Sequence, residues 1–309
     1  MRLAVELFGA DFQNPVLLAA GTCGFGQEVA DVVELEQLGG FVTKSVTVEP
    51  RKGNPAPRVV EFAGGMLNSV GLANPGLEAT RRDKLPWLAA NVARAQVFVS
   101  LAGHTVQEFF RLVEGLDDGP GFLGFELNLS CPNDAQRDGL PFALDPGAVS
   151  TIVSGCRHRT DRPLLAKLAP NDPDLARTVG VATEAGADGL TLVNTLPGLL
   201  LRPDGGEAEL GGGPGGMSGP ALLPLGLRSV EEARRHTTLP LIGVGGVLGP
   251  ADAVAYARAG AQLVQIGTAS FADPRAGQRL VRGLVRWGRS RGLGSWQDLV
   301  RRTEATVLG

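Results

Sequence analysis

The chain has 309 residues, of which 43% are apolar and 20% are charged, the balance of a soluble globular protein with enough apolar material for a large core. Its formal net charge of −3 argues against nucleic acid or an anionic membrane as the main partner, because phosphate binding needs a basic excess or a basic face. The first residues form neither a secretory leader nor an apolar run long enough to cross a bilayer, so we expect one cytoplasmic domain over residues 1–309.

Eight short apolar runs recur along the chain and predict β-strands. They cover residues 15–21, 41–47, 96–103, 122–130, 163–170, 188–195, 240–246 and 262–269. Segments with helical periodicity lie between them, at residues 31–38, 105–116, 145–155, 172–186, 225–236 and 250–260, and the basic segment 275–291 predicts a last amphipathic helix. Apolar strands that alternate with helices indicate parallel strands buried on both faces, so the sequence predicts an α/β fold, a (β/α)8 TIM barrel.

Two connections are much longer than the others. Residues 49–76 follow the second predicted strand, and residues 196–224 follow the sixth. Both insertions leave carboxyl ends of strands, where the active sites of such barrels are built. Long connections in a compact domain usually serve function, so we expect both insertions to border the site.

The cysteines are three, Cys23, Cys131 and Cys156, and they lie far apart in the sequence. An odd number of dispersed cysteines predicts reduced thiols rather than disulfides. The chain also lacks the grouped ligands of a zinc or iron–sulfur site, so we predict no metal in it. Cys156 falls within a predicted helix and is best explained by packing, and Cys23 is better explained by packing than by ligand contact.

Polar residues end most of the predicted strands and would converge on one mouth of the barrel: Lys44, Ser45, Ser100, Asn128, Ser130, Cys131, Lys167, Asn194 and Thr195. Any one of them could be an ordinary strand-end residue, but the set predicts a ligand site. Glycine-rich turns at 242–247 and 265–270 follow the seventh and eighth strands, the usual phosphate site of these barrels. A phosphate anchor with lysines and amides could hold flavin mononucleotide (FMN).

The segments TKSVTVEPRKGNPAPR, NSVGLANPG, ELNLSCPN, VNTLPG, GGMSGP, IGVGG and QIGTASF occur in order along nearly the whole chain. Together they resemble a class 1 dihydroorotate dehydrogenase. The resemblance implies an FMN enzyme that oxidises (S)-dihydroorotate to orotate in pyrimidine biosynthesis, with Cys131 as the general base that removes the C5 proton. The other main class of the family carries serine at that position.

Carried over position by position, the resemblance also implies the residues of the site. The substrate would be bound by Lys44, Asn68, Ser69, Val70, Gly71, Leu72, Asn128, Asn194 and Thr195. The cofactor would be bound by Ala20, Lys44, Ser45, Ser100, Asn128, Lys167, Val193, Gly219, Gly245, Gly246, Gly267 and Thr268. The family's pattern has serine where this chain has Ala20, asparagine where it has Ser100, and commonly lysine where it has Leu223.

The start and end of the second insertion resemble the 1B branch of the class. That implies a homodimer of this chain joined by an electron-transfer subunit with FAD and a [2Fe-2S] cluster, which reduces NAD⁺, in a heterotetramer. The alternatives are a fumarate-using 1A enzyme, a dihydrouridine synthase-like flavoenzyme, and a flavin-binding protein without turnover. The residue before Cys131 is Ser130, where a dihydrouridine synthase would carry glycine, and this argues against that enzyme.

Overall fold

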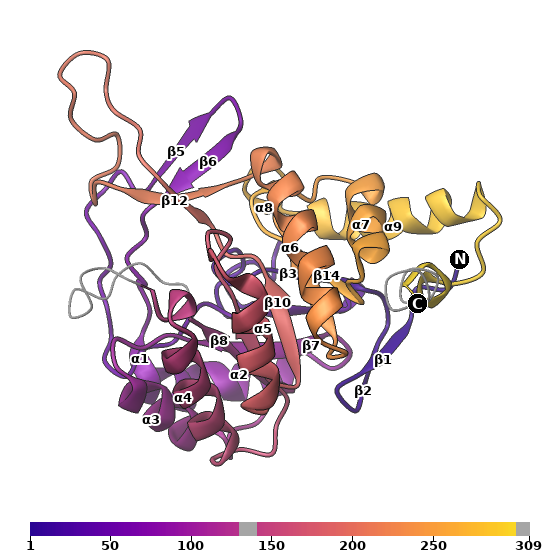
Figure 1. The fold of residues 1–309 in the computed structure, drawn as a ribbon, viewed down its shortest axis with the longest axis horizontal. Coiled ribbons are helices and arrows are strands. Elements are labelled where there is room, and N and C mark those ends of the chain that lie inside the picture. The colour runs from indigo at the N-terminus through magenta and orange to yellow at the C-terminus, as the bar shows by residue number, and fades with distance from the viewer. Residues whose placement is uncertain (130–140, 301–309) are drawn as a thin grey trace.

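The structure, a computed structural model, describes residues 1–129 and 141–300. Eight parallel strands close into a barrel in chain order, so the predicted TIM barrel is confirmed (Figure 1). The strands are β3 (Val16–Leu18), β4 (Gly40–Val42), β7 (Gln96–Leu101), β8 (Gly124–Asn128), β9 (Leu164–Lys167), β10 (Gly189–Leu192), β13 (Leu241–Val244) and β14 (Leu263–Ile266). Each overlaps one of the eight apolar runs, as strands covered on both faces should.

Helices surround the barrel and begin at the residues that their sequences indicate. The longer ones are α3 (Val106–Leu116), α4 (Pro146–Arg157), α5 (Leu175–Glu184), α6 (Leu223–His236), α7 (Pro250–Ala259) and α9 (Ala276–Arg289). Thr105, Asp145 and Asp174 each accept a backbone N–H in the first turn of the helix that follows. Shorter helices are α1 (Gly76–Ala79), α2 (Leu85–Asn91) and α8 (Ala269–Ala272).

The helix predicted at residues 31–38 is wrong. The segment contains turns and a 3-10 helix at Leu35–Gln37. Its buried side chains are Val33, Leu35 and Leu38, whereas Val32 is 57% exposed. A spacing of two and then three residues does not place three side chains on one face of an α-helix.

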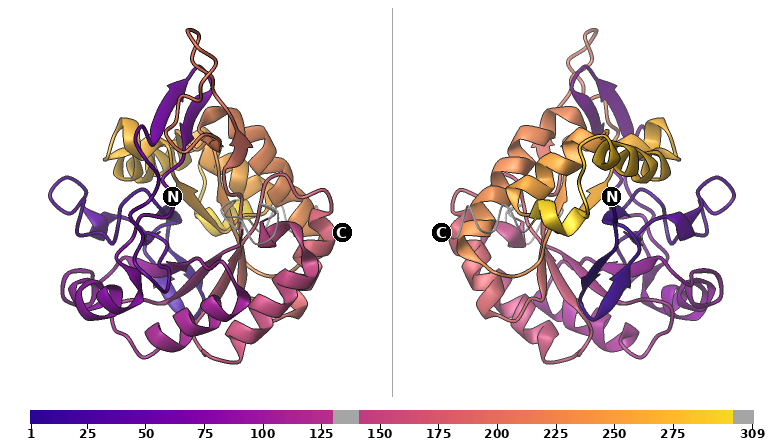
Figure 2. Two further views of the ribbon diagram at one scale, coloured as in Figure 1. Left: turned by 90° about the vertical axis from the view of Figure 1, so that its left-hand side faces the viewer. Right: turned by 90° about the vertical axis from the view of Figure 1, so that its right-hand side faces the viewer.

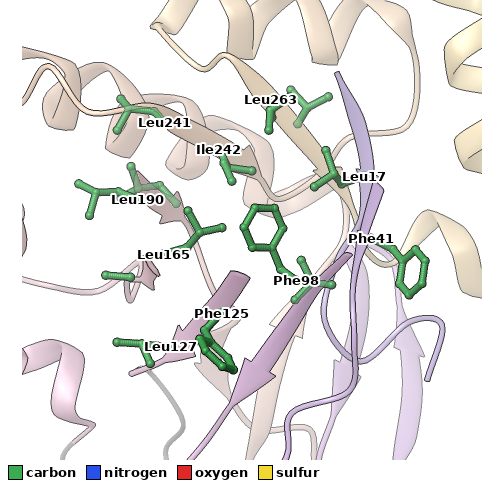
Figure 3. Packing of buried hydrophobic residues seen from close by; sticks show 14 of the residues in the cluster. Leu17, Phe41, Phe98, Phe125, Leu127, Leu165, Leu190, Leu241, Ile242 and Leu263 are labelled. Atoms are coloured by element: carbon green, nitrogen blue, oxygen red, sulfur yellow. The ribbon is translucent and has the colours of Figure 1, made fainter. Parts of the chain in front are cut away.

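An aromatic cluster closes the amino-terminal end of the barrel. The hairpin of β1 (Val5–Leu7) and β2 (Ala10–Phe12) brings Phe8 and Phe12 to Phe98 on β7, with ring centroids 5.8 and 6.5 Å from it. Figure 3 shows Phe98 among leucine and isoleucine side chains from several strands. Because this end is filled with apolar side chains, a ligand can enter only at the opposite end, where the strands finish.

The two long insertions form one antiparallel sheet that projects from the barrel (Figure 2). Its strands are β5 (Val59–Phe62), β6 (Gly65–Asn68), β11 (Leu196–Gly198) and β12 (Gly215–Ser218), in the order β11-β12-β6-β5. β6 from the first insertion pairs with β12 from the second, with Asn68 opposite Gly216. The insertions therefore support each other and stand together beside the mouth of the barrel.

Candidate active site

A cavity of about 670 Å³ lies at the carboxyl ends of the barrel strands. Its wall includes loops that follow the strands and residues of the projecting sheet, among them Val59, Met66 and Gly216. The size lies within the range of small-molecule and cofactor sites. Both insertions thus border the cavity, which is the position expected from the sequence.

The cavity collects nearly all the residues assigned to substrate and cofactor from the sequence. Its lining includes Ala20, Lys44, Ser45, Asn68, Ser69, Val70, Gly71, Leu72, Asn128, Lys167, Val193, Asn194, Thr195, Gly219, Gly245, Gly246, Gly267 and Thr268. Ser100 is fully buried behind Ser45, and the two hydroxyl oxygens are 2.8 Å apart. Cys131 and Ser130 lie outside the described residues.

A chain of hydrogen bonds joins the polar residues at three strand ends. Asn128 Nδ2 donates to Ser45 Oγ over 3.3 Å, and Asn194 Nδ2 donates to Asn128 Oδ1 over 3.0 Å. The backbone N–H of Thr195 donates to Asn194 Oδ1 over 2.8 Å. The oxygens of both amides accept hydrogen bonds from the protein, so the chain is polarised to favour a ligand that itself accepts hydrogen bonds.

Both predicted lysines line the cavity. Lys44 follows β4, and its backbone N–H donates to Gly24 O over 2.7 Å, which ties the strand end to the first loop. Lys167 ends β9, is 5% exposed, and has its ammonium 3.4 Å from Glu126 Oε1. Positive charge at the cavity wall would stabilise an anionic ligand or negative charge that develops on it.

The loop after β6 has a strained backbone beside the cavity. Gly71 and Leu72 adopt φ angles of +69° and +56°, in the left-handed region that a leucine rarely occupies. Asn74 holds this loop: Nδ2 donates to Leu72 O and to Thr47 Oγ1, both over 2.7 Å, and Oδ1 accepts the N–H groups of Gly76 and Thr47. The strained conformation thus persists because a neighbouring side chain fixes it.

Glycines form the opposite wall, after β13 and β14. Gly245 and Gly246 have φ angles of +125° and +70°, and a Cβ on Gly246 would lie 2.6 Å from Leu223 Cβ. Tyr256 Oη donates to Gly245 O over 2.8 Å and fixes the turn. Burial raises the pKa of Tyr256, so its hydroxyl stays protonated and able to donate. Exposed backbone N–H groups at such turns suit an anion such as phosphate.

With this geometry established, comparison with known proteins decides the family. The model of the family described as dihydroorotate dehydrogenase matches residues 2–287. The chain belongs to the dihydroorotate dehydrogenase family. The resemblance drawn from its motifs is therefore confirmed.

Relatives within the dihydroorotate dehydrogenase family align over almost the whole chain. A Pelobacter propionicus protein named dihydroorotate dehydrogenase B (NAD(+)), catalytic subunit, is 42% identical over 298 residues, 96% of this chain and 97% of the relative. A Cutibacterium acnes protein of the same name is 40% identical over 283 residues, 92% of each chain. A Lactiplantibacillus plantarum protein named dihydroorotate dehydrogenase A (fumarate) is 39% identical over 303 residues, 98% of this chain and 99% of the relative.

The residues that depart from the pattern of the dihydroorotate dehydrogenase family differ in whether they line the cavity. Ala20 lines the cavity and supplies no side-chain hydrogen bond where a serine is expected. Ser100 makes its contact with Ser45, one step away from the cavity. Leu223 opens α6 and packs beside Gly246. A lost hydrogen bond is worth about 0.5–1.5 kcal/mol, so we expect each departure to change ligand affinity by a modest amount.

Sequence reasoning missed a charged pair on the cavity wall. Glu28 Oε1 lies 2.9 Å from Lys84 Nζ, and its other oxygen accepts the N–H of Phe25 over 2.7 Å. Burial alone would raise the pKa of Glu28, but the hydrogen bonds from Lys84 and Phe25 outweigh it, and the pKa is lowered. Glu28 and Lys84 lie 56 residues apart on segments with no motif, so no sequence signal linked them.

Cys23 and Cys156 are buried packing residues. Cys23 is 1% exposed, with its Sγ 3.7 Å from Val42 O, and Cys156 lies inside α4 with no exposure. Burial raises the pKa of both thiols to about 12.

Among the residues that the structure describes, no helix is long and apolar enough to span a membrane.

Proposed function

We propose that this chain oxidises (S)-dihydroorotate to orotate, the redox step of de novo pyrimidine (UMP) biosynthesis, with FMN as its cofactor. The observation that carries the proposal is the cavity, in which residues suited to a phosphate, a flavin ring and a pyrimidine meet in one space of about 670 Å³. Membership of the dihydroorotate dehydrogenase family supports the same activity.

The glycine wall fits the phosphate end of FMN. A Cβ built on Gly267 would meet Ala19 Cβ at 3.9 Å and otherwise open space, so the missing side chain leaves room for a ligand. Gly219, Gly245, Gly246, Gly267 and Thr268 would hold the phosphate, and Ala20, Lys44, Ser45, Asn128, Lys167 and Val193 would hold the ring. Ser100 would act through Ser45. When bound, FMN supplies an acceptor for the hydride from substrate C6.

The amide chain fits the substrate end. The C2, C4 and carboxylate oxygens of a dihydroorotate accept hydrogen bonds, which is the ligand polarity that Asn128 and Asn194 favour. Asn68 on β6 in the first insertion and Thr195 after β10 would complete the contacts, with Ser69, Val70, Gly71 and Leu72 packed against the ring. Lys44 would lie between the substrate and the flavin. The residues thereby orient the C5–H bond towards a base, which is a positioning contribution to catalysis.

Cys131 is the base that we propose, from the family motif that surrounds it. The base would remove the C5 proton while hydride leaves C6. A general base typically contributes 10²–10⁴-fold in rate. A free thiol has a pKa of about 8.5, so a minority is ionised at neutral pH. Turnover should therefore increase as the pH is raised from 6 towards that value.

We further propose that electrons pass to NAD⁺ through a partner subunit with FAD and a [2Fe-2S] cluster, in a heterotetramer built on a homodimer of this chain. The printed names of the Pelobacter and Cutibacterium relatives, which specify NAD(+) and a catalytic subunit, support this acceptor. Fumarate is the second candidate for the electron acceptor, because a relative of nearly equal identity is named for it.

The location that we propose for the protein is the cytoplasm, where unpaired thiols stay reduced.

The test is anaerobic addition of dihydroorotate to the purified chain. Bleaching of the flavin absorption band is expected for the wild type, and for C131A a rate at least 100-fold lower with FMN still bound. C156A removes a thiol from the helical layer and serves as the control. Near-normal bleaching by C131A would contradict the assignment of the base, and absence of FMN from the wild type would contradict the function.

The acceptor is tested separately on reduced protein. Fumarate should leave the isolated chain reduced, whereas NAD⁺ should reoxidise it only when the co-expressed electron-transfer subunit is present. Reoxidation of the isolated chain by fumarate would replace the proposed acceptor with the second candidate.

A further inference from the structure

A polar layer fills the barrel interior directly below the cavity. Glu126 on β8, Thr191 on β10 and Gln265 on β14 are fully buried and come from alternate strands of the barrel. Layers of four side chains from alternate strands are the normal filling of such barrels, but they are usually made of branched apolar residues. A carboxylate in this position therefore needs an explanation.

Glu126 is the centre of the layer. Its Oε2 accepts from Thr191 Oγ1 over 2.9 Å and from Gln265 Nε2 over 3.0 Å, and its Oε1 lies 3.4 Å from Lys167 Nζ. All three partners donate, so the site is built for an ionised carboxylate. Gln265 turns its N–H towards Glu126 although its own buried Oε1 then has no partner among the described residues.

Stability alone does not account for this arrangement. Replacing a buried ion pair with packed apolar residues is often neutral or stabilising, because desolvation offsets the attraction between the charges. The two charges differ in position: Glu126 is enclosed by the barrel, whereas Lys167 ends β9 and lines the cavity. Glu126 does not line the cavity, so the residue through which it would act on a ligand is the lysine above it.

We propose that Glu126 is a positioning residue, which fixes the ammonium of Lys167 in the floor of the cavity and balances its charge where it faces the cofactor. This inference rests on the proposed function, in that FMN is the group above the lysine. Reduction of a flavin adds negative charge to its ring, and a fully compensated ammonium stabilises that charge less than an uncompensated one. Glu126 thereby lowers the reduction potential of the bound cofactor and favours onward transfer of its electrons.

The test compares wild type with E126Q, E126Q/K167M and T191V. E126Q keeps the shape and removes the negative charge, so reduced FMN should gain about tenfold in affinity relative to oxidised FMN, a rise of about 30 mV for a two-electron couple. E126Q/K167M removes both charges and should show no such rise. T191V removes one hydrogen bond to Glu126 without changing charge, and should alter the affinity ratio by less than twofold.

The potential is measured by dye equilibration, and thermal unfolding is measured on the FMN-free proteins. E126Q should unfold at a lower temperature than wild type, and E126Q/K167M should recover at least half of the loss, because the lone ammonium is removed. An unchanged or lowered potential in E126Q, or a rise that persists in E126Q/K167M, would overturn the proposal. If wild type binds no FMN, the proposed function fails. The unfolding comparison then still tests the pairing of Glu126 with Lys167: an unfolding temperature of E126Q/K167M no higher than that of E126Q would contradict it.

Discussion

Replacing Asn74 with alanine removes four hydrogen bonds that hold the strained loop beside the cavity. The side chain donates to Leu72 O and Thr47 Oγ1 and accepts from the N–H groups of Gly76 and Thr47, over 2.7–3.2 Å. Each such bond contributes about 0.5–1.5 kcal/mol net, and the freed backbone groups regain part of this by meeting water. We expect N74A to lower the free energy of unfolding by about 2–4 kcal/mol.

We expect N74A to weaken ligand binding as well as to lower the stability of the protein. Leu72 keeps a φ of +56° at a cost of about 1–3 kcal/mol, and without Asn74 its backbone can relax to a commoner conformation. The residues that line the substrate end, from Asn68 to Leu72, would then leave their positions. We expect orotate to bind about tenfold more weakly to N74A, a loss of about 1.4 kcal/mol.

Two assays separate these effects. Urea unfolding followed by circular dichroism gives the free energy of unfolding, and the change of the flavin spectrum on titration gives the orotate affinity. N91A is the matched control, because Asn91 is exposed at the end of α2 and donates one hydrogen bond, to Trp87 O. If N74A and N91A lose the same stability and both bind orotate normally, the loop is not held as we describe.

The buried thiols and the glycine wall give two further expectations. Folding raises the pKa of Cys23 and Cys156 to about 12, so the protonated form is favoured in the folded protein; this stabilisation is complete below about pH 8.5 and is lost as the pH rises towards 12. Urea unfolding at pH 8 and 10 should show a loss of about 2 kcal/mol per thiol, which C23A/C156A lacks; an equal loss in that variant would contradict it. Y256F removes the hydrogen bond to Gly245 O and should lower the free energy of unfolding by about 1 kcal/mol and weaken FMN binding several-fold, as flavin fluorescence on dilution would measure; unchanged values would show that the turn is held otherwise.

The barrel was predictable because each strand carries its own signal. Runs such as residues 15–21 and 240–246 are apolar throughout, as is typical of a strand covered on both faces. The segment at 31–38 misled because its mixture of charged and apolar residues satisfies helical periodicity, whereas tertiary contacts hold it otherwise. Glu36 accepts the N–H groups of Ala93 and Arg94, and this interaction with a distant segment favours a turn.

The projecting sheet could not be predicted, because its pairing joins segments about 150 residues apart. The sequence marks both insertions as unusual, and the strands β6 and β12 are short and rich in glycine. Glycine-rich strands carry little alternation from which a register could be read. The pairing of Asn68 with Gly216 follows from three-dimensional proximity alone, and it is what brings Asn68 to the cavity.

The polar layer below the cavity could have been predicted from single residues in the sequence, although the overall composition does not indicate it. Glu126 is a charged residue inside the apolar run LGFELNL, a departure as marked as the lysine in LLAKLA. A buried charge requires a partner, so these two anomalies in neighbouring strands predict each other. The distance of 3.4 Å between their side chains shows that reading unusual residues in pairs would have found the contact.

Residue types alone also leave the direction of the amide chain undecided. An asparagine can present either an N–H or an oxygen to a ligand, and the choice depends on what its other atoms contact. Here the N–H of Thr195 engages the oxygen of Asn194, whose own N–H engages the oxygen of Asn128. The orientation of each amide therefore fixes that of the next. The series ends at the hydroxyls of Ser45 and Ser100, which can rotate to accept or donate as Asn128 requires. A backbone N–H that cannot reverse its polarity thus sets the orientation of two side chains, and the site favours ligand oxygens because of where Thr195 lies in the fold.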